Sequence, residues 1–327
     1  MLLSAACRTM RVANMRMMYS CITHRCITLL LTSLLVACGS APRVPSAFNA
    51  RPTSNLTSPS PAFMPLALPW ASRGYWRGAP VAAGQPSEPL WINVYIEGDG
   101  AAWTQRQTAP QDPTPRNPLA ASLASRDPNP WVIYLGRPCQ YLDQPNLAQC
   151  PMAWWTDARY GDAVLAILNG ALTQAIQQLQ THPFNNGLAT DGATQPIRLR
   201  LIGYSGGGVI ATLLAQQRDD VACLVTVAAP LDLRAWTKLQ GLSPLNQSQN
   251  PATTVIRRAN LAQTHWYGKA DRIVPPQAVG DYGLQGAGLS AMAVHVLPDY
   301  DHRSPWAENW PRLLGQSCQD GKGSKQK

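Results

Sequence analysis

Charged residues are scarce in this 327-residue chain, where Asp, Glu, Lys and Arg together make up 14% of the sequence. The formal net charge is nevertheless +9, a balance that nucleic-acid-binding proteins often have. The basic residues are scattered, however, and form no stripe on a recognition helix. Several of them lie in residues 1–37, which contain no acid and account for part of the imbalance. We therefore expect no nucleic-acid partner.

The chain also lacks the residue spacings of the common metal and nucleotide sites. It contains no Cys-x-x-Cys pair and no Cys/His spacing of the zinc-binding kind, so we expect no metal site. It contains neither a P-loop lysine nor a Gly-x-Gly-x-x-Gly sequence, which argues against a nucleotide-binding fold. We therefore expect the protein to need neither a metal nor an organic cofactor.

The apolar run near the N-terminus is too short to span a bilayer. CITLLLTSLLVA, residues 26–37, has about a dozen residues, which suits the core of an export signal. It ends at Leu35-Val36-Ala37-Cys38, which resembles the lipobox of bacterial lipoproteins. The resemblance implies that residues 1–37 are a signal peptide and that Cys38 is lipidated. The protein would then be anchored in the bacterial cell envelope, at the outer membrane and facing the periplasm.

Composition divides the rest of the chain into three parts. Residues 38–75 are rich in Pro and Ser and predict a flexible tether, because such a stretch buries little apolar surface. Residues 76–318 predict the folded domain, and residues 319–327 a disordered basic tail.

Four cysteines lie in the predicted domain, and an even number in an exported chain suggests disulfides. Cys139 and Cys150 would close a short loop, which leaves Cys223 and Cys318 as the second pair.

Short apolar runs alternate with helical patterns from residue 91 onward. Strands are predicted at 91–96, 131–136, 197–204, 222–229, 264–268 and 293–298, and helices at 117–125, 163–180, 206–217 and 304–315. This alternation is typical of an α/β fold with a mostly parallel central sheet and helices on both faces. Residues 230–260 show no clear period and predict a small irregular cap over a site.

Gly203-Tyr204-Ser205-Gly206-Gly207 stands between a predicted strand and a predicted helix. A Gly-x-Ser-x-Gly sequence in that context indicates a nucleophile elbow, in which a sharp turn exposes the serine hydroxyl. The glycines are needed because the residues around the turn approach each other closely. Ser205 is therefore the candidate nucleophile.

A nucleophilic serine needs a base, and the base needs an acid that orients it. Where the serine lies on a nucleophile elbow, the acid and then the histidine follow it along the chain. His302, in the loop after the last predicted strand, is the candidate base, since His265 and His295 lie inside predicted strands. Asp271, in the loop after the strand that contains His265, is the candidate acid, and Asp232 is its competitor.

An oxyanion hole needs two main-chain donors. The N–H of Gly206, next to the serine, is the first candidate, and the loop Glu97-Gly98-Asp99-Gly100 supplies the second. Within that loop we expect the N–H of Asp99, with that of Gly100 as the alternative.

Residues 91–315 resemble α/β-hydrolases through VYIEGDG, GYSGG, GKADRIVPP and DYDH in the expected order. YLGRPCQY and LDLRAWT resemble a set of exported bacterial members of unassigned substrate. A departure is Glu97, where many members carry histidine. The resemblance implies a serine hydrolase of carboxylic-ester type that acts on a small-molecule or lipid ester. A peptidase or amidase with the same triad and a non-catalytic envelope lipoprotein are the alternatives.

Overall fold

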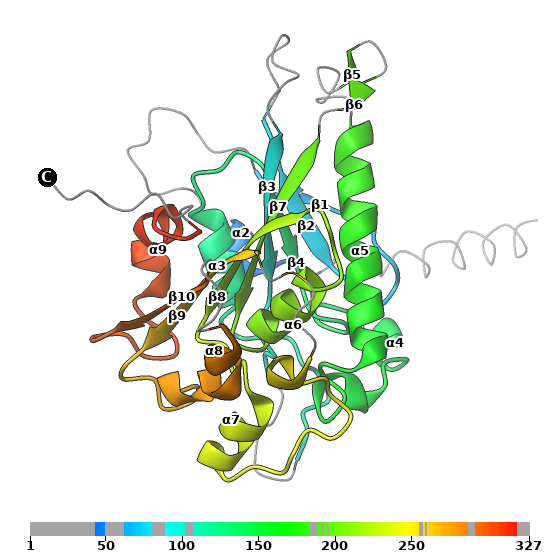
Figure 1. The fold of residues 1–327 in the computed structure, drawn as a ribbon. Coiled ribbons are helices and arrows are strands. Elements are labelled where there is room, and N and C mark those ends of the chain that lie inside the picture. The colour runs from blue at the N-terminus through cyan, green and yellow to red at the C-terminus, as the bar shows by residue number, and fades with distance from the viewer. Residues whose placement is uncertain are drawn as a thin grey trace, which may run out of the picture. The chain divides into compact units, whose positions relative to one another are not determined.

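The computed structural model describes residues 43–49, 62–79, 89–101, 108–182, 189–190, 193–194, 196–254, 258, 260–286 and 292–318. An eight-stranded sheet lies at its centre, in the order β1-β2-β4-β3-β7-β8-β9-β10 (Figure 1). The strands are β1 (Met64–Pro65), β2 (Gly74–Arg77), β3 (Leu90–Ile96), β4 (Val132–Leu135), β7 (Ile197–Tyr204), β8 (Val221–Val227), β9 (Ala262–Gly268) and β10 (Met292–Leu297). A separate short hairpin pairs β5 (Ala189–Thr190) with β6 (Ala193–Thr194).

The sheet is parallel from β4 to β10, and β2 is antiparallel to both β1 and β4. The central strands are buried on both faces, which is why they occur in the sequence as nearly continuous apolar runs. The predicted mostly parallel α/β sheet is confirmed. The parallel strands bring their carboxyl ends to one edge, where the loops that follow β3, β7, β9 and β10 meet.

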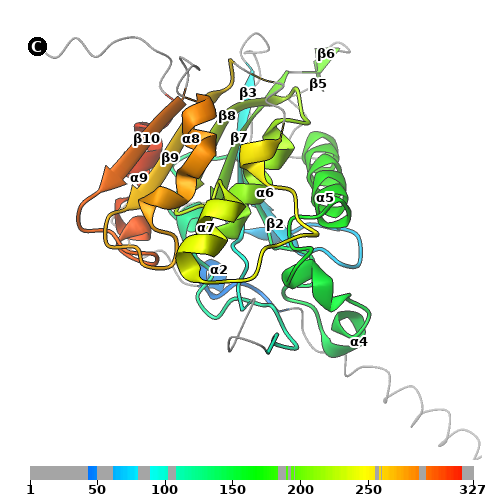
Figure 2. The same ribbon diagram turned by 60° about the horizontal axis from the view of Figure 1, so that its bottom comes forward.

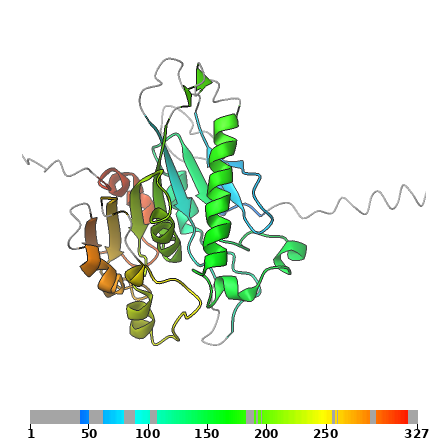
Figure 3. The ribbon, with the colours of Figure 1, turned by 45° about the vertical axis from the view of Figure 1, so that its right-hand side comes forward.

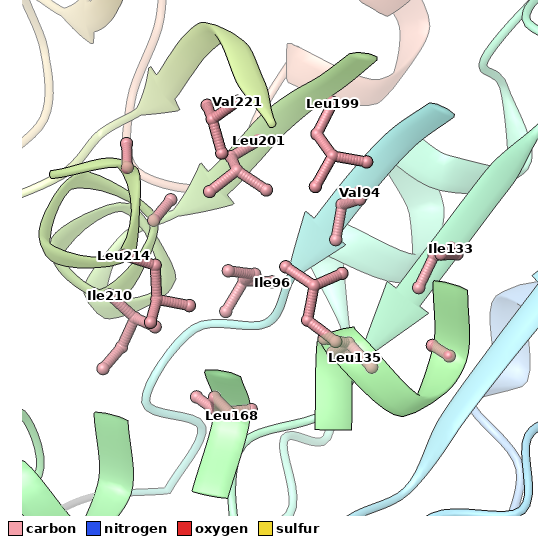
Figure 4. Close-up of a cluster of buried hydrophobic side chains, with 14 of the residues drawn as sticks. Val94, Ile96, Ile133, Leu135, Leu168, Leu199, Leu201, Ile210, Leu214 and Val221 are labelled. Carbon is pink, nitrogen blue, oxygen red and sulfur yellow. The ribbon is translucent and has the colours of Figure 1, made fainter. Parts of the chain in front are cut away.

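Helices cover both faces of the sheet (Figure 1; Figure 3). On one face, α5 (Asp162–Thr181) and α6 (Gly206–Ala215) pack against a core of aliphatic side chains from β3, β4 and β7, part of which is drawn in Figure 4. On the other face, α3 (Leu119–Ser125) and α9 (Trp306–Gly315) pack against an aromatic-rich core that includes Trp306 and Trp310.

All six predicted strands and four predicted helices are present, with ends that differ from the predictions by at most two residues. The predictions missed β1 and β2, which are short or interrupted by polar residues. They also missed several short helices: α4 (Gln144–Leu147), α7 (Leu233–Gln240), α8 (Gly280–Gly286), and the 3-10 turns Met152–Trp155, Pro251–Thr253 and Pro276–Val279.

The segment 230–260 is more regular than its composition suggests. Helix α7 begins after Asp232, whose side chain accepts hydrogen bonds from the N–H groups of Arg234 and Ala235 at 3.0 and 3.2 Å. It ends at Gly241, which has φ +61° and supplies the left-handed residue that commonly closes a helix. The predicted cap thus contains one capped helix.

The flexible tether predicted for residues 38–75 is wrong over 43–49 and 62–75. Phe48, in the short helix α2 (Ser46–Asn49), stacks on Phe63 with ring centroids 4.1 Å apart and meets Tyr134 edge-on at 5.1 Å. Arg43 forms an ion pair with Asp112, and β1 and β2 begin before residue 76. Aromatic contacts therefore attach this Pro- and Ser-rich segment to the domain, although its composition is typical of a linker.

The signal peptide at 1–37, the lipidation site Cys38 and the basic tail at 319–327 lie outside the described residues. They stay predictions. Within the described residues, no helix is both long and apolar enough to cross a membrane.

Both expected cysteine pairs lie at disulfide distance. Cys139 and Cys150 have sulfur atoms 2.16 Å apart, and Cys223 and Cys318 have theirs 2.17 Å apart. The first pair closes the loop after β4, and the second ties β8 to the chain that follows α9.

Candidate active site

Ser205 occupies a strained turn between β7 and α6. Its φ and ψ are +51° and −125°, a conformation that residues with a Cβ rarely adopt. Its N–H donates to the carbonyl of Val227 at 2.8 Å, which fixes the turn to β8. A Cβ on Gly203 would lie 2.3 Å from the carbonyl oxygen of Gly207, so the motif needs a glycine there. The geometry is that of the expected nucleophile elbow.

The structure brings His302 and Asp271 into direct contact. Nδ1 of His302 lies 2.8 Å from Oδ2 of Asp271, and both side chains are buried or nearly so. The other carboxylate oxygen, Oδ1, accepts the N–H groups of Ile273 and Val274, both at 2.8 Å. Because Oδ1 is held by the loop, Oδ2 is left to orient the imidazole. The pair follows β9 and β10, at the same sheet edge as Ser205.

Tyr204 connects the serine turn to the histidine loop. Its hydroxyl donates to the main-chain carbonyl of His302 at 3.0 Å, and its ring lies 5.2 Å from the imidazole. Burial raises the pKa of Tyr204, so the phenol stays protonated and remains a donor. Its position directly before Ser205 is its one signal in the sequence, and that position does not predict this contact.

The competing residues have other roles. His265 is fully buried, its Nδ1 lies 2.8 Å from Thr226 Oγ1, and burial lowers its pKa to about 3. His295 stacks on Trp266 with centroids 4.4 Å apart. Asp232 caps α7 and also accepts the side chain of Asn250 at 3.1 Å. Within the part of the chain that the structure describes, none of the three forms a hydrogen bond or ion pair with the side chain of His302 or Asp271.

Glu97 anchors a helix. Its buried carboxylate accepts the N–H groups of Gly98, Ala120 and Ala121 at 3.0, 3.3 and 3.3 Å, and the hydroxyl of Tyr134 at 3.0 Å. Ala120 and Ala121 lie in the first turn of α3, whose free N–H groups favour an anion. Burial raises the pKa of Glu97, and these four donors oppose the shift. These hydrogen bonds attach the start of the loop Glu97-Gly98-Asp99-Gly100 to α3 and β4.

Asp99 lies at the centre of a buried ionic network that the sequence did not reveal. Oδ1 accepts from Arg137 at 2.8 Å, and Oδ2 accepts from Arg159 at 3.2 Å and from the hydroxyl of Tyr160 at 2.6 Å. Burial would raise the pKa of Asp99, but the two guanidinium groups hold it below its ordinary value. The carboxylate stays ionised, and one negative charge faces two positive charges.

The side chain of Asp99 lies against the residue that follows Ser205. The carboxylate of Asp99 packs against Gly206, because a Cβ on that glycine would lie 2.0 Å from Oδ1. Within the described residues, the main-chain N–H groups of Asp99 and Gly100 form no hydrogen bond. Gly100 has φ +66°, and a Cβ there would lie 2.1 Å from the carbonyl oxygen of Pro113, so this loop position needs glycine.

Two cavities lie near these loops. One of about 180 Å³ is bordered by Tyr204, Arg303 and residues of α2 and α3. A larger one of about 650 Å³ lies between α7 and the chain that follows it. Among the described residues, no group of His, Cys, Asp and Glu side chains could hold a metal ion.

No protein-family model and no curated protein matches the chain. Solved structures do resemble it. A puromycin-hydrolyzing peptidase of Mycobacterium tuberculosis aligns with a TM-score of 0.50 and 17% identity, over 81% of this chain and 41% of its own. An acylaminoacyl peptidase in complex with Z-Gly-Gly-Phe-chloromethyl ketone aligns with a TM-score of 0.50 and 10% identity, over 81% of this chain and 43% of its own.

The esterase Pf2001 of Pyrococcus furiosus aligns with a TM-score of 0.48 and 13% identity, over 79% of this chain and 91% of its own. The chain spans less than half the length of the two peptidases. With the sheet order described above, the similarity to the two peptidases shows an α/β-hydrolase fold, as the sequence resemblance implied.

Proposed function

We propose that this chain with the α/β-hydrolase fold is a serine hydrolase of carboxylic esters, in which Ser205, His302 and Asp271 act together. The observation that carries the proposal is the combination of a serine held at φ +51° with a buried His302–Asp271 contact of 2.8 Å at the same sheet edge. A strained turn of this kind costs stability and is commonly kept where a nucleophile must be exposed.

In the proposed reaction, Ser205 Oγ attacks the carbonyl carbon of the ester and His302 Nε2 accepts its proton. The Nδ1–H of His302 donates to Asp271 Oδ2, which fixes the tautomer and stabilises the imidazolium. The imidazolium then protonates the departing alkoxide, and an acyl-enzyme remains. Water, deprotonated by His302, attacks this acyl group and releases the carboxylic acid and free Ser205.

The tetrahedral oxyanion is proposed to accept the N–H of Gly206 and that of Asp99, or of Gly100 in its place. The free N-terminus of α6 adds a favourable dipole. The network of Arg137, Arg159 and Tyr160 supports the proposal because it fixes the side chain of Asp99 and, with it, the loop that carries the donors. Donors held in this way need no reorganisation during the reaction.

Location in the cell envelope, with a lipid anchor at Cys38, is also part of the proposal. The lipobox-like sequence before Cys38 supports it, and disulfides suit an exported protein. Incorporation of labelled fatty acid in a bacterial host tests the anchor. Incorporation should be lost in Cys38→Ser, and equal incorporation in both proteins would contradict it.

A fluorophosphonate probe tests the activated serine. A chain that starts at residue 39 retains every described residue and should be labelled, and its Ser205→Ala variant should not. A labelled protein is then offered an ester and an amide with the same acyl group. Hydrolysis of the ester alone supports an esterase, and comparable hydrolysis of the amide points to a peptidase. A folded protein that takes no label would instead fit a non-catalytic envelope protein.

A further inference from the structure

Helix α7 presents apolar side chains to solvent next to the loop that carries Asp271. Leu239 is 51% exposed, Leu242 is 43% exposed, and Ile273 in the neighbouring loop is 44% exposed. The side chain of Gln240 donates to the carbonyl of Arg272 at 2.9 Å, which holds the end of α7 beside that loop. The helix lies at the lower end of the described ribbon in Figure 1 and in front of the sheet in Figure 2.

The exposed charges of α7, the two residues after it and the loop that carries Asp271 all have one sign. In residues 233–242 and 269–274, every exposed charged side chain is basic, namely Arg234, Lys238, Lys269 and Arg272. Among the described residues, none of these four forms an ion pair. Asp281, an exposed acid, lies near the opposite end of the helix, where its N–H donates to Asp232. We call Lys238, Leu239, Leu242, Arg272 and Ile273 the α7 surface.

The inner face of α7 is firmly attached to the domain. Trp236 packs with Tyr267, Val274 and Ala278, and its indole N–H donates to the carbonyl of Ile273 at 2.8 Å. Leu239 is therefore exposed on a helix whose inner face is already packed against the domain, and Leu242 is exposed just after that helix ends. Single exposed leucines need no explanation, but three large apolar side chains among unpaired cations form a pattern of their own.

The larger cavity opens next to this surface. Lys238 and Leu242 line it together with Leu233, Leu245 and other residues, and its volume is about 650 Å³. Cavities of this size hold small organic ligands. A molecule that sits at the α7 surface thus has beside it a cavity lined by both polar and apolar side chains.

We propose that the α7 surface binds the face of an anionic lipid bilayer. Apolar side chains that project among cations match such a surface, because the side chains enter the acyl boundary while Lys and Arg meet the phosphates. In this orientation, the loop that carries Asp271 faces the bilayer. The inference does not depend on catalysis, since binding is measured without a substrate.

Sedimentation with vesicles tests the proposal. A chain that starts at residue 39 contains neither Cys38 nor the apolar run before it, and the structure describes none of the omitted residues. It should bind vesicles of phosphatidylglycerol mixed with phosphatidylcholine and should not bind phosphatidylcholine alone. Salt should weaken the binding. Lys238→Gln and Arg272→Gln should each lower the partition coefficient about fivefold, and Leu239→Ser with Leu242→Ser should lower it at least tenfold.

Matched substitutions elsewhere serve as controls. Arg116→Gln and Arg126→Gln remove exposed cations from another region, and Val294→Ser with Val296→Ser removes exposed apolar side chains from β10. These variants should bind as the unaltered chain does, and circular dichroism checks that every variant is folded. Equal loss in control and α7 variants would overturn the proposal. So would binding of monomeric dodecyl phosphate without binding of vesicles, which would make the cavity a small-molecule site only.

Discussion

The carboxylate of Asp99 lies directly over the Cα of Gly206, so that a methyl group added to this glycine would lie 2.0 Å from Oδ1 and 2.6 Å from the Tyr160 hydroxyl. Glycine at this position therefore lets a buried ionic network approach the residue that follows the candidate nucleophile. The contact links the two segments that are proposed to hold the oxyanion.

Gly206→Ala should for this reason lower kcat by about 10²- to 10³-fold, the loss typical of one displaced oxyanion donor. Ester hydrolysis checks the expectation. Gly170→Ala in α5 is the matched control, because an added Cβ there meets nothing within 4 Å. It should leave kcat unchanged and stabilise the helix by about 0.5–1 kcal/mol. A Gly206→Ala enzyme with normal kcat would show that this contact does not position the donors.

Asp99→Asn should destabilise the protein by about 3 kcal/mol, because Arg137 and Arg159 would keep their charges in a buried site without a counter-ion. Urea unfolding measures the change. Tyr160→Phe removes only one neutral donor and should cost about 1 kcal/mol. Equal losses in the two variants would mean that the charges of the network contribute little.

Asp271→Asn should retain the fold and lose about 10⁴-fold in kcat. The amide oxygen can still accept the N–H groups of Ile273 and Val274, but an amide nitrogen facing His302 stabilises the wrong tautomer of the imidazole. Ester hydrolysis and the unfolding midpoint are measured on the same sample. Asp232→Asn is the comparison, and it should affect stability while kcat stays near that of the unaltered enzyme.

The buried His265 should make stability fall in acid. Its folded pKa is about 3 and the unfolded value is about 6.5, so below pH 6.5 the unfolded chain binds a proton that the folded chain does not. Its contribution to stability is complete above pH 6.5. It declines by about 1.4 kcal/mol per pH unit between 6.5 and 3. His265→Gln should be less stable at pH 7 and show a shallower decline, as followed by urea unfolding at several pH values.

Phe48→Ala should destabilise the domain by about 2 kcal/mol, since its ring packs on Phe63 and against Tyr134. Thermal unfolding of the two proteins gives the difference. Ser46→Ala, an exposed position in the same short helix, should change stability by at most about 0.5 kcal/mol. If Phe48→Ala were also neutral, this segment would behave as the tether that its composition suggests.

The strands and long helices could be predicted because their signals are local. A buried parallel strand such as β7 is an apolar run, and α5 repeats its apolar residues at helical spacing. Ser205, Asp271 and His302 were chosen by motif and chain order, and the structure places His302 and Asp271 in contact.

The remaining parts depend on contacts between distant residues. Arg137 and Arg159 have no local pattern that assigns them to Asp99, which lies 38 and 60 positions away. The role of Glu97 was equally hidden, because it depends on where α3 begins in space. Helix α7 was missed because eight residues are too few for a clear period, and its start depends on a side-chain cap at Asp232.

The disulfide between Cys223 and Cys318 has a consequence for a cleaved chain. Its two cysteines are 95 positions apart, and both Asp271 and His302 lie between them. A protease that cuts one peptide bond in this interval leaves two pieces that stay covalently joined, so that Asp271 and His302 remain attached to Ser205 through the chain or the disulfide. The closed ring also lowers the conformational entropy of the unfolded chain, which in the chain-entropy picture raises the free energy of that state by about 4–5 kcal/mol. In an environment that contains proteases, a nick in this half of the domain therefore need not separate the three residues of the proposed triad.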